Sequence, residues 1–534
     1  MEDISIFAIP HLKDEVTQYL TRCDLAQCSL VSKQWSSWFT PTLWHTINRR
    51  HPQIESSTLI KYRDHIRELI GVDTAFASKD DLWPLPNLRR LEQDNGHSLF
   101  TMVESNLRLL RLLQMTELFF LRTLKLELFL DLESVQARLL ETLLHLPQLK
   151  KLDLQSRKHA SPIYIQQLIQ TCSRLDSLTL GFESYDEDLN EKSMARRQAA
   201  KRAMELMPVT RLRELKYYFE QPDQERALLP SLLRRCPLLE SLDIRPIRGP
   251  RALKEIMSVF EDGACPRLKR LCPGNTFFVK SFEGDVGLLR PLARKRDSNY
   301  TGNDTWNQER QCGLESFAVV NGNFESTLAL ALVEYHSTTL TSLKAPRTTI
   351  HLSDLATLLS GLPRLQSLVT RVDLAERLDL AECMEAALQK QWVCLGLKHL
   401  SLTWKGGSKD MRIIRERHVN SMTNRCMHYI FEQVGRLIEL EEWTLEREFE
   451  LLYLSDGFLI WLSGLKRMKS LVYEARQQDQ QLDAVEAEWM IENWPALIHI
   501  VLRGVNGNKL SKEGQLAEDQ FKATLKERRP WIHI

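Results

Sequence analysis

The residues best suited to chemistry in this 534-residue chain are its 10 cysteines and 14 histidines. Thiolates and imidazoles can act as nucleophiles or as metal ligands, but the spacing here favours neither role. Cys23 and Cys28 have no second Cys or His pair nearby that would complete a zinc site. The histidines are dispersed, and a lone histidine in a repeat is far more often structural than catalytic. We therefore expect reduced, largely buried thiols in an intracellular protein.

Sequence motifs of common enzymes are also absent. The chain contains no Gly-x-x-x-x-Gly-Lys-Ser/Thr, no Gly-x-Gly-x-x-Gly after a strand, no Gly-x-Ser-x-Gly and no His-Glu-x-x-His. One alternative stays open, which is a hydrolase with its active site in a long insertion, where Cys312 and the nearby His336 are the candidates. Otherwise we predict no catalytic residue, no metal and no cofactor.

Composition indicates a folded protein without a strong preference for anions. The 71 Lys and Arg against 70 Asp and Glu leave a net charge of +1, which does not favour nucleic acid or an anionic membrane as partner. No run of about 18 uninterrupted apolar residues predicts a membrane span, and the start MEDISIFAIPHLKDE lacks the apolar core of a signal peptide. We expect a cytoplasmic location, a nuclear one, or both.

One phrase, Leu-x-x-Leu-x-Leu, organises most of the chain and is clearest in LPQLKKLDL at 146–154. Helical spacing gives way there to alternation, so that Leu152 and Leu154 share one face of a short strand and Asp153 has the other. Fourteen copies begin between Leu88 and Leu497, one about every 31 residues. Because a single helix–strand unit cannot bury its apolar side, this repetition predicts a stacked solenoid.

The segments before these phrases have apolar residues at i, i+3 and i+4, and several end at a proline. Each unit is therefore predicted as helix, turn and strand, which resembles an irregular leucine-rich repeat with parallel strands on the concave side and helices outside. Three long spacings place extra residues at about 183–211, 275–313 and 404–430. These insertions are interpreted either as loops that clasp a partner or as solvated surface.

Alternation within each strand also predicts which side chains face the concave side. The candidates for binding a target there are polar or aromatic residues between and after the leucines: Asp153, Gln155, Lys216, Tyr218, Asp243, Arg245, Arg371, Ser401, Thr403, Glu446 and Arg503. Their mixed chemistry suits a protein surface better than a polyanion.

The first 50 residues form a separate helical pattern. Pro10 suits the first turn of a helix, and Asp24 is predicted as the N-cap of a second helix. About 40 residues make a poor core alone, so we expect this module to rest on the following domain or on a partner.

Ile9-Pro10, Tyr19-Leu20, DLAQCSLVSKQW at 24–35 and Leu43-Trp44 together resemble an F-box. With the repeats, the chain resembles the fungal-type F-box/leucine-rich-repeat family. This resemblance implies a three-helix unit that binds the small adaptor subunit of a cullin–RING (SCF-type) ubiquitin ligase, and through it a cullin. The matching contact positions are Ile9, Pro10, Val16, Leu20, Leu25, Leu30, Val31 and Trp35.

The family resemblance implies a non-catalytic substrate-recognition subunit whose solenoid holds an unidentified target protein. The alternative is a ligase-independent protein-binding scaffold in which the N-terminal module only caps the solenoid or recruits the adaptor for another purpose. The predicted fold class is α/β, with an F-box at 1–50, a helical connector at 51–85, a leucine-rich-repeat-like solenoid at 86–505 and a C-terminal cap or tail at 506–534.

Overall fold

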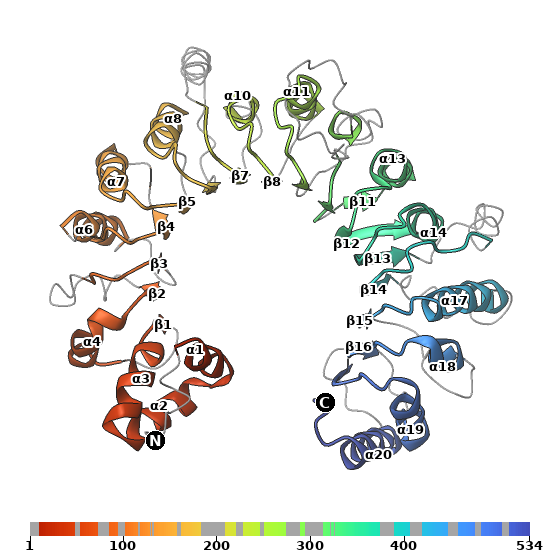
Figure 1. Ribbon diagram of the computed structural model, residues 1–534. Coiled ribbons are helices and arrows are strands. Elements are labelled where there is room, and N and C mark those ends of the chain that lie inside the picture. Colours follow the sequence, from red (N-terminus) through yellow and green to blue (C-terminus); the bar gives the residue numbers. More distant parts are fainter. Residues whose placement is uncertain are drawn as a thin grey trace, which may run out of the picture. The chain divides into compact units, whose positions relative to one another are not determined.

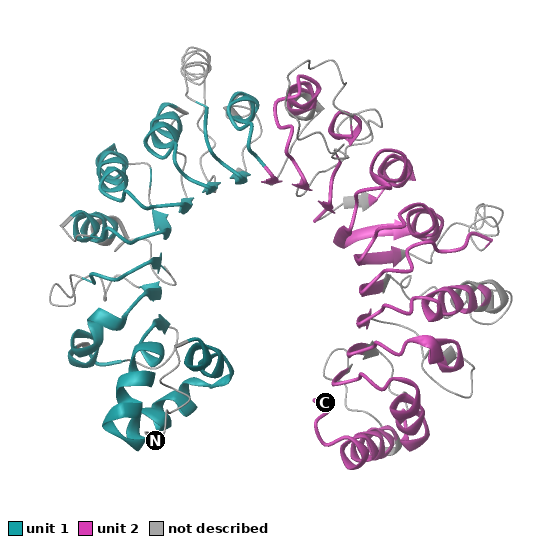
Figure 2. Cartoon of the chain, in the orientation of Figure 1, with its two compact units in different colours: residues 1–239 teal, residues 240–534 magenta. Residues whose placement is uncertain are grey.

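The computed structural model divides the chain into two compact units, residues 1–239 and 240–534 (Figure 2). The residues that the structure describes are 10–48, 54–72, 85–93, 102–115, 118–128, 130, 133–156, 162–182, 209–219, 228–245, 250–273, 289–293, 313–320, 322–324, 326–373, 389–405, 419–446, 458–475, 482–504 and 512–534. Each unit is a layer of parallel strands with helices on one face (Figure 1).

Unit 1 begins with three helices and continues as repeats. Its strands are β1 Thr46–Asn48, β2 Glu68–Val72, β3 Arg90–Gln93, β4 Thr123–Leu128, β5 Lys151–Ser156, β6 Ser177–Phe182 and β7 Glu214–Phe219. Its helices are α1 Pro10–Tyr19, α2 Arg22–Val31, α3 Lys33–Leu43, α4 Ser56–Tyr62, the 3-10 turn η2 Arg63–His65, α6 Met102–Met115, α7 Glu133–Leu144, α8 Pro162–Thr171 and α10 Leu228–Arg234. The strands pair in chain order, all in parallel.

The register of unit 1 aligns the repeated leucines into a continuous core. One leucine from each strand of β2 to β7 is the direct neighbour of the next across the sheet, and none of them is more than 1% exposed. They include Leu124, Leu152 and Leu178. Such a row buries apolar side chains that no single repeat could cover. Gly71, with φ of 74°, lies at a register shift between β2 and β3, where other residues would be strained.

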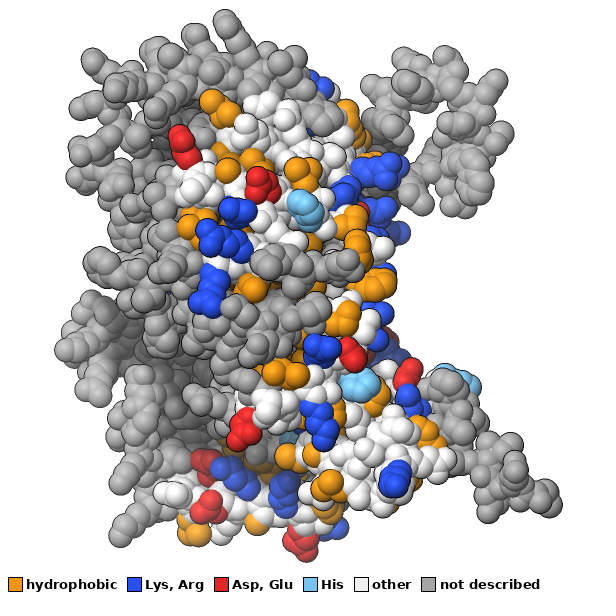
Figure 3. All heavy atoms as spheres, turned by 90° about the vertical axis from the view of Figure 1, so that its left-hand side faces the viewer, with side chains coloured by type: hydrophobic (Ala, Val, Ile, Leu, Met, Phe, Trp, Pro, Cys, Tyr) orange, Lys and Arg blue, Asp and Glu red, His pale blue; other side chains and the backbone are white. Residues whose placement is uncertain are grey.

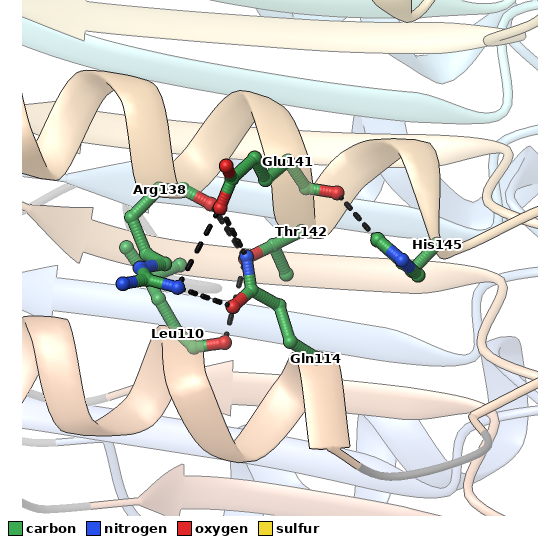
Figure 4. A network of polar contacts seen from close by, with 6 residues as sticks. All are labelled: Leu110, Gln114, Arg138, Glu141, Thr142 and His145. Carbon is green, nitrogen blue, oxygen red and sulfur yellow. Dashed lines mark hydrogen bonds and ion pairs between the residues drawn. The ribbon is translucent and has the colours of Figure 1, made fainter.

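Polar contacts hold the helical layer of unit 1 together between α6 and α7 (Figure 4). Gln114 on α6 accepts a hydrogen bond from Arg138 on α7 at 3.0 Å and donates one to the Glu141 carboxylate at 3.2 Å. The Thr142 hydroxyl is 2.7 Å from the Arg138 carbonyl oxygen and 3.4 Å from that of Leu110. Neighbouring repeats are thus tied by polar groups as well as by leucine packing.

Unit 2 repeats the same plan. Its strands are β8 Ser241–Arg245, β9 Arg270–Cys272, β10 Ser316–Ala318, β11 Gly322–Phe324, β12 Ser342–His351, β13 Ser367–Asp373, β14 His399–Lys405, β15 Glu442–Glu446, β16 Ser470–Ala475 and β17 His499–Gly504. Its helices are α11 Pro250–Glu261, α13 Ser326–His336, α14 Leu352–Gly361, α17 Val419–Gly435, α18 Phe458–Trp461, the 3-10 turn η6 Leu462–Gly464, α19 Ala484–Asn493 and α20 Lys512–Arg528. The strands are parallel, and β12 pairs with both short strands β10 and β11.

The end of the chain covers the last strand of unit 2. The backbone N–H of His533 donates to Ile498 at 2.9 Å, and the His533 carbonyl accepts from Ile500 at 2.8 Å. Arg529 also donates to the Trp494 carbonyl at 2.9 Å, which fixes the end of α20 beside α19. These bonds satisfy backbone groups that would otherwise be exposed at the edge of the sheet.

The predicted fold class is confirmed: three N-terminal helices precede a leucine-rich-repeat-like solenoid of parallel strands and helices. Each of the fourteen leucine phrases leads into a strand. The sequence analysis did not predict β1, β2 or β11, although Ile66-x-x-Leu69-x-x-Val72 before and in β2 is the phrase with one residue inserted. The connector predicted as helical at 51–85 is helical only in part, because α4 ends at Tyr62, η2 follows it and residues 68–72 form β2. Most of the three long insertions lies outside the described residues.

Candidate functional site

The first candidate site is the group of three helices at the N-terminus. Helix α2 begins with a capping box in which the Thr21 hydroxyl accepts from the Asp24 N–H at 3.3 Å and the Asp24 carboxylate accepts from the Thr21 N–H at 2.9 Å. Thr21 is therefore the N-cap, and the prediction of Asp24 as N-cap is wrong by three residues, because Asp24 is the partner on the first turn. Hydrogen bonds from Thr21 lower the pKa of the Asp24 carboxyl.

A small core holds these helices against the repeats. Phe39 of α3 is fully buried, and its ring centroid lies 5.5 Å from that of Trp35. Trp44, just after α3, stacks on Tyr62 of α4 with centroids 4.5 Å apart. The chain then enters β1, where Ile47 is fully buried beside Leu69 of β2. The helices are thus joined to the sheet of unit 1 by a strand of that sheet.

Apolar side chains remain exposed at the ends of two of these helices. Tyr19 at the end of α1 is 83% exposed, and Leu30 and Val31 at the end of α2 are 79% and 64% exposed. Val16, one turn before Tyr19, is also exposed. Several large apolar groups left in water on one small module are typical of a protein-binding surface.

The predicted adaptor contacts fall into three groups. Val16, Leu30 and Val31 are exposed, Leu20 and Trp35 are partly exposed, and Leu25 is buried at 5% exposure in the module's core. Ile9 and the side chain of Pro10 lie outside the described residues. Their role as contacts stays a prediction. The structure adds Tyr19 as a candidate contact; the sequence analysis placed it in the F-box pattern but not among the contact positions, although it lies one turn from Val16.

The second candidate site is the strand face opposite the helices. In unit 1, Asp153 of β5 is the direct neighbour of Lys125 and of Thr179, and Thr179 is the neighbour of Lys216. Burial raises the pKa of the Asp153 carboxyl, while Lys125 opposes this rise. This part of the face carries alternating charges that largely neutralise one another.

Two residues further along each strand, the same face is polar and aromatic. Gln155 and Tyr218 are the direct neighbours of Gly181 on either side. A Cβ on Gly181 would lie 3.6 Å from the Gln155 side chain and 3.8 Å from that of Tyr218. The two predicted residues therefore lie close together across a glycine.

In unit 2 the predicted face residues are spread over more strands. Arg371 and Thr403 are direct neighbours on β13 and β14, and Ser401 lies two residues before Thr403. Asp243 is half-buried on β8, beside Cys272. Arg245, Glu446 and Arg503 belong to strands, but their side chains lie outside the described residues. The role of these positions in target binding stays a prediction.

The hydrolase alternative gains no support from the described residues. Cys312 lies outside them. His336 is fully buried, its Nδ1 accepts a hydrogen bond from the Leu314 N–H at 3.2 Å, and burial lowers its pKa to about 4. Within the described part of the chain no group of three or more His, Cys, Asp or Glu residues could hold a metal ion. No described helix is both long and apolar enough to cross a bilayer.

Comparisons with known proteins identify the first site. Residues 10–45 match the F-box domain, which covers helices α1–α3. No curated protein matches the chain. Among solved structures, the chain is similar to the leucine-rich repeat-containing protein LegL7 from Legionella pneumophila, at 13% identity over 70% of this chain and 98% of that one, with a TM-score of 0.33. It is also similar to the complex of Rad7 and Elc1 in yeast, at 11% identity over 96% and 97% of the chains, with a TM-score of 0.34.

Proposed function

We propose that this protein is the substrate-recognition subunit of a cullin–RING ubiquitin ligase of the SCF type. The observation that carries the proposal is the coincidence of the F-box match with three helices that leave Tyr19, Leu30 and Val31 in water. In this proposal the adaptor covers those side chains and connects the chain to a cullin. Burying each of them would contribute about 1.5–3 kcal/mol before the costs of association.

The strand faces bind the target in this proposal, and the chain contributes no nucleophile. The rest of the ligase complex supplies the ubiquitin-charged enzyme. The solenoid raises the local concentration of target lysines near that enzyme. β1 supports this role, since the F-box helices are continuous with the sheet through a paired strand. We further propose that the chain belongs to the fungal-type F-box/leucine-rich-repeat family and acts in the cytoplasm, the nucleus or both. The buried thiols of Cys172 and Cys394, whose pKa values burial raises to about 12, suit a reducing compartment.

Adaptor binding is tested by co-purification with the adaptor subunit. We expect the wild type to form a one-to-one complex and a Leu30→Asp, Val31→Asp variant to bind at least about 100-fold more weakly, because the complex would bury two unpaired carboxylates. Trp35 is a poor choice for this test, since it contacts Phe39 in the core.

The control is Leu330→Asp, which changes an exposed leucine on α13 in unit 2. It should bind the adaptor like the wild type. If the wild type does not bind, or if the double variant binds unchanged, the ligase proposal is wrong. A complex that forms but modifies no protein in a competent extract would favour the ligase-independent scaffold.

A further inference from the structure

One backbone position recurs immediately before the strands of unit 1. The N–H of each residue at this position donates to the carbonyl of its counterpart in the preceding repeat, at 2.7–2.9 Å. From β2 to β7 the residues are Arg67, Arg89, Arg122, Lys150, Asp176 and Arg213. Five of the six are basic, and their backbones are one strand spacing apart, about 4.8 Å.

The same position in unit 2 has a different charge pattern. From β8 to β17, leaving out β11, it holds Glu240, Lys269, Glu315, Thr341, Gln366, Lys398, Glu441, Lys469 and Ile498. Opposite charges neighbour each other there: Lys269 pairs with Glu315 at 2.8 Å and Lys469 with Glu441 at 2.6 Å. Unit 2 therefore shows that this backbone position accommodates alternating positive and negative side chains. In unit 1 the side chains at this position are mainly positive.

In unit 1 the carboxylates are engaged elsewhere. Glu92 accepts a hydrogen bond from Arg90 at 2.8 Å, and Glu214 forms an ion pair with Lys216 at 3.2 Å. Asp176 is the one acidic residue of the row and lies between Lys150 and Arg213, with its carboxylate 4.0 Å from the Lys150 ammonium. Among the described residues the side chains of Arg67, Arg89 and Arg122 form no ion pair. Like charges on adjacent strands destabilise a sheet, so this row is costly unless an anion covers it.

Two aromatic side chains accompany this row. Phe119 and Phe120 lie in the turn just before Arg122 and are 51% and 48% exposed. On the side of unit 1 shown in Figure 3, Lys and Arg side chains gather with hydrophobic ones toward the right-hand edge. We call Arg67, Arg89, Arg122, Lys150 and Arg213, together with Phe119 and Phe120, the basic edge.

We propose that the basic edge binds an extended acidic segment of the target protein, with an apolar side chain of that segment packed on Phe119 and Phe120. The proposal rests on the proposed function, because it names the chemical class of the target. The first four basic residues span about 14 Å, which four to five extended residues would cover. A row one residue wide, interrupted by Asp176 and bordered by Glu68 and Glu214, suits a peptide better than a nucleic acid.

The test measures binding of fluorescein-labelled Glu-Glu-Leu-Glu-Glu-Leu-Glu-Glu to the full-length protein by fluorescence anisotropy. The wild type should bind it more tightly at 50 mM than at 200 mM salt. Arg89→Gln, Arg122→Gln should weaken binding about tenfold, and Arg89→Lys, Arg122→Lys should retain most of it. A Phe119→Ser, Phe120→Ser variant should lose affinity for this peptide but not for a peptide of eight glutamates.

The matched control is Lys269→Gln, Lys469→Gln, which removes the same charge at the same backbone position in unit 2 and should bind like the wild type. The proposal is overturned if the wild type does not bind the peptide, if the control loses as much affinity, or if a uridine octanucleotide binds more tightly. Circular dichroism confirms that each variant is folded. Adaptor binding is measured on the same samples, so a failure of the acidic-segment proposal is distinguished from a failure of the ligase proposal.

Discussion

At the scale of single residues, His336 shows how a repeat protein uses a polar group in its core. Its imidazole is neutral because burial lowers its pKa from 6.5 to about 4, and its Nδ1 accepts the Leu314 N–H that leads into β10. From the sequence alone, His336 and the nearby Cys312 are candidate catalytic residues. Its burial and its backbone partner could not be predicted without the neighbouring repeat.

His336 also predicts a pH dependence of stability. The unfolded chain takes up a proton below pH 6.5 that the folded chain resists down to about pH 4. Stability from this group is therefore present above pH 6.5 and is lost as the pH falls through that window, by up to about 3 kcal/mol. Urea unfolding at pH 7.5 and pH 5 should show this loss in the wild type.

The comparison variant is His336→Leu, which cannot titrate. It should be less stable than the wild type at pH 7.5, because the Leu314 N–H loses its acceptor, but it should lose less stability between pH 7.5 and pH 5. Equal losses in the two proteins would show that His336 does not carry the pH dependence.

At the scale of elements, the end of α17 depends on a close approach of two backbones. A Cβ on Gly435 would overlap the carbonyl oxygen of Trp461 at the end of α18. We expect Gly435→Ala to lower the free energy of unfolding by about 2 kcal/mol or more, since backbone on both sides must move. Gly396→Ala is the control, because a Cβ there meets nothing within 4 Å, and it should be near neutral. Equal melting temperatures for the two variants would contradict this prediction.

The elements themselves differ in how well the sequence predicts them. Leu152 and Leu154 define β5 because two leucines at alternate positions need the same buried face, and most of the fourteen phrases follow this alternation. β1, β2 and β11 are not predicted in this way, because β1 and β11 contain no leucine and β2 has Gly71 inserted before Val72. The alternation also identifies the strand face. It cannot identify the basic edge, whose residues become neighbours only through the stacking of repeats.

At the scale of the whole molecule, the F-box helices are followed directly by β1, the first strand in the sheet of unit 1. Deleting residues 1–48 would remove β1, expose the edge of β2 and uncover Leu69, which is fully buried. We expect the truncated protein to self-associate, because unpaired strand edges recruit other strands. Size-exclusion chromatography with light scattering should show this, while Leu30→Asp, Val31→Asp should remain monomeric. A monodisperse truncated protein with an unchanged melting temperature would mean that β1 is dispensable.

The pairing of β1 with β2 also fixes the distance of each repeat of unit 1 from the F-box helices. Every repeat of unit 1 lies a whole number of strand spacings from the F-box helices, in steps of about 4.8 Å. In the proposed ligase, a segment bound one repeat further along would present its lysines one step further from the adaptor. We therefore expect that inserting or removing a repeat between β2 and β7 would change which lysines of a bound target are modified.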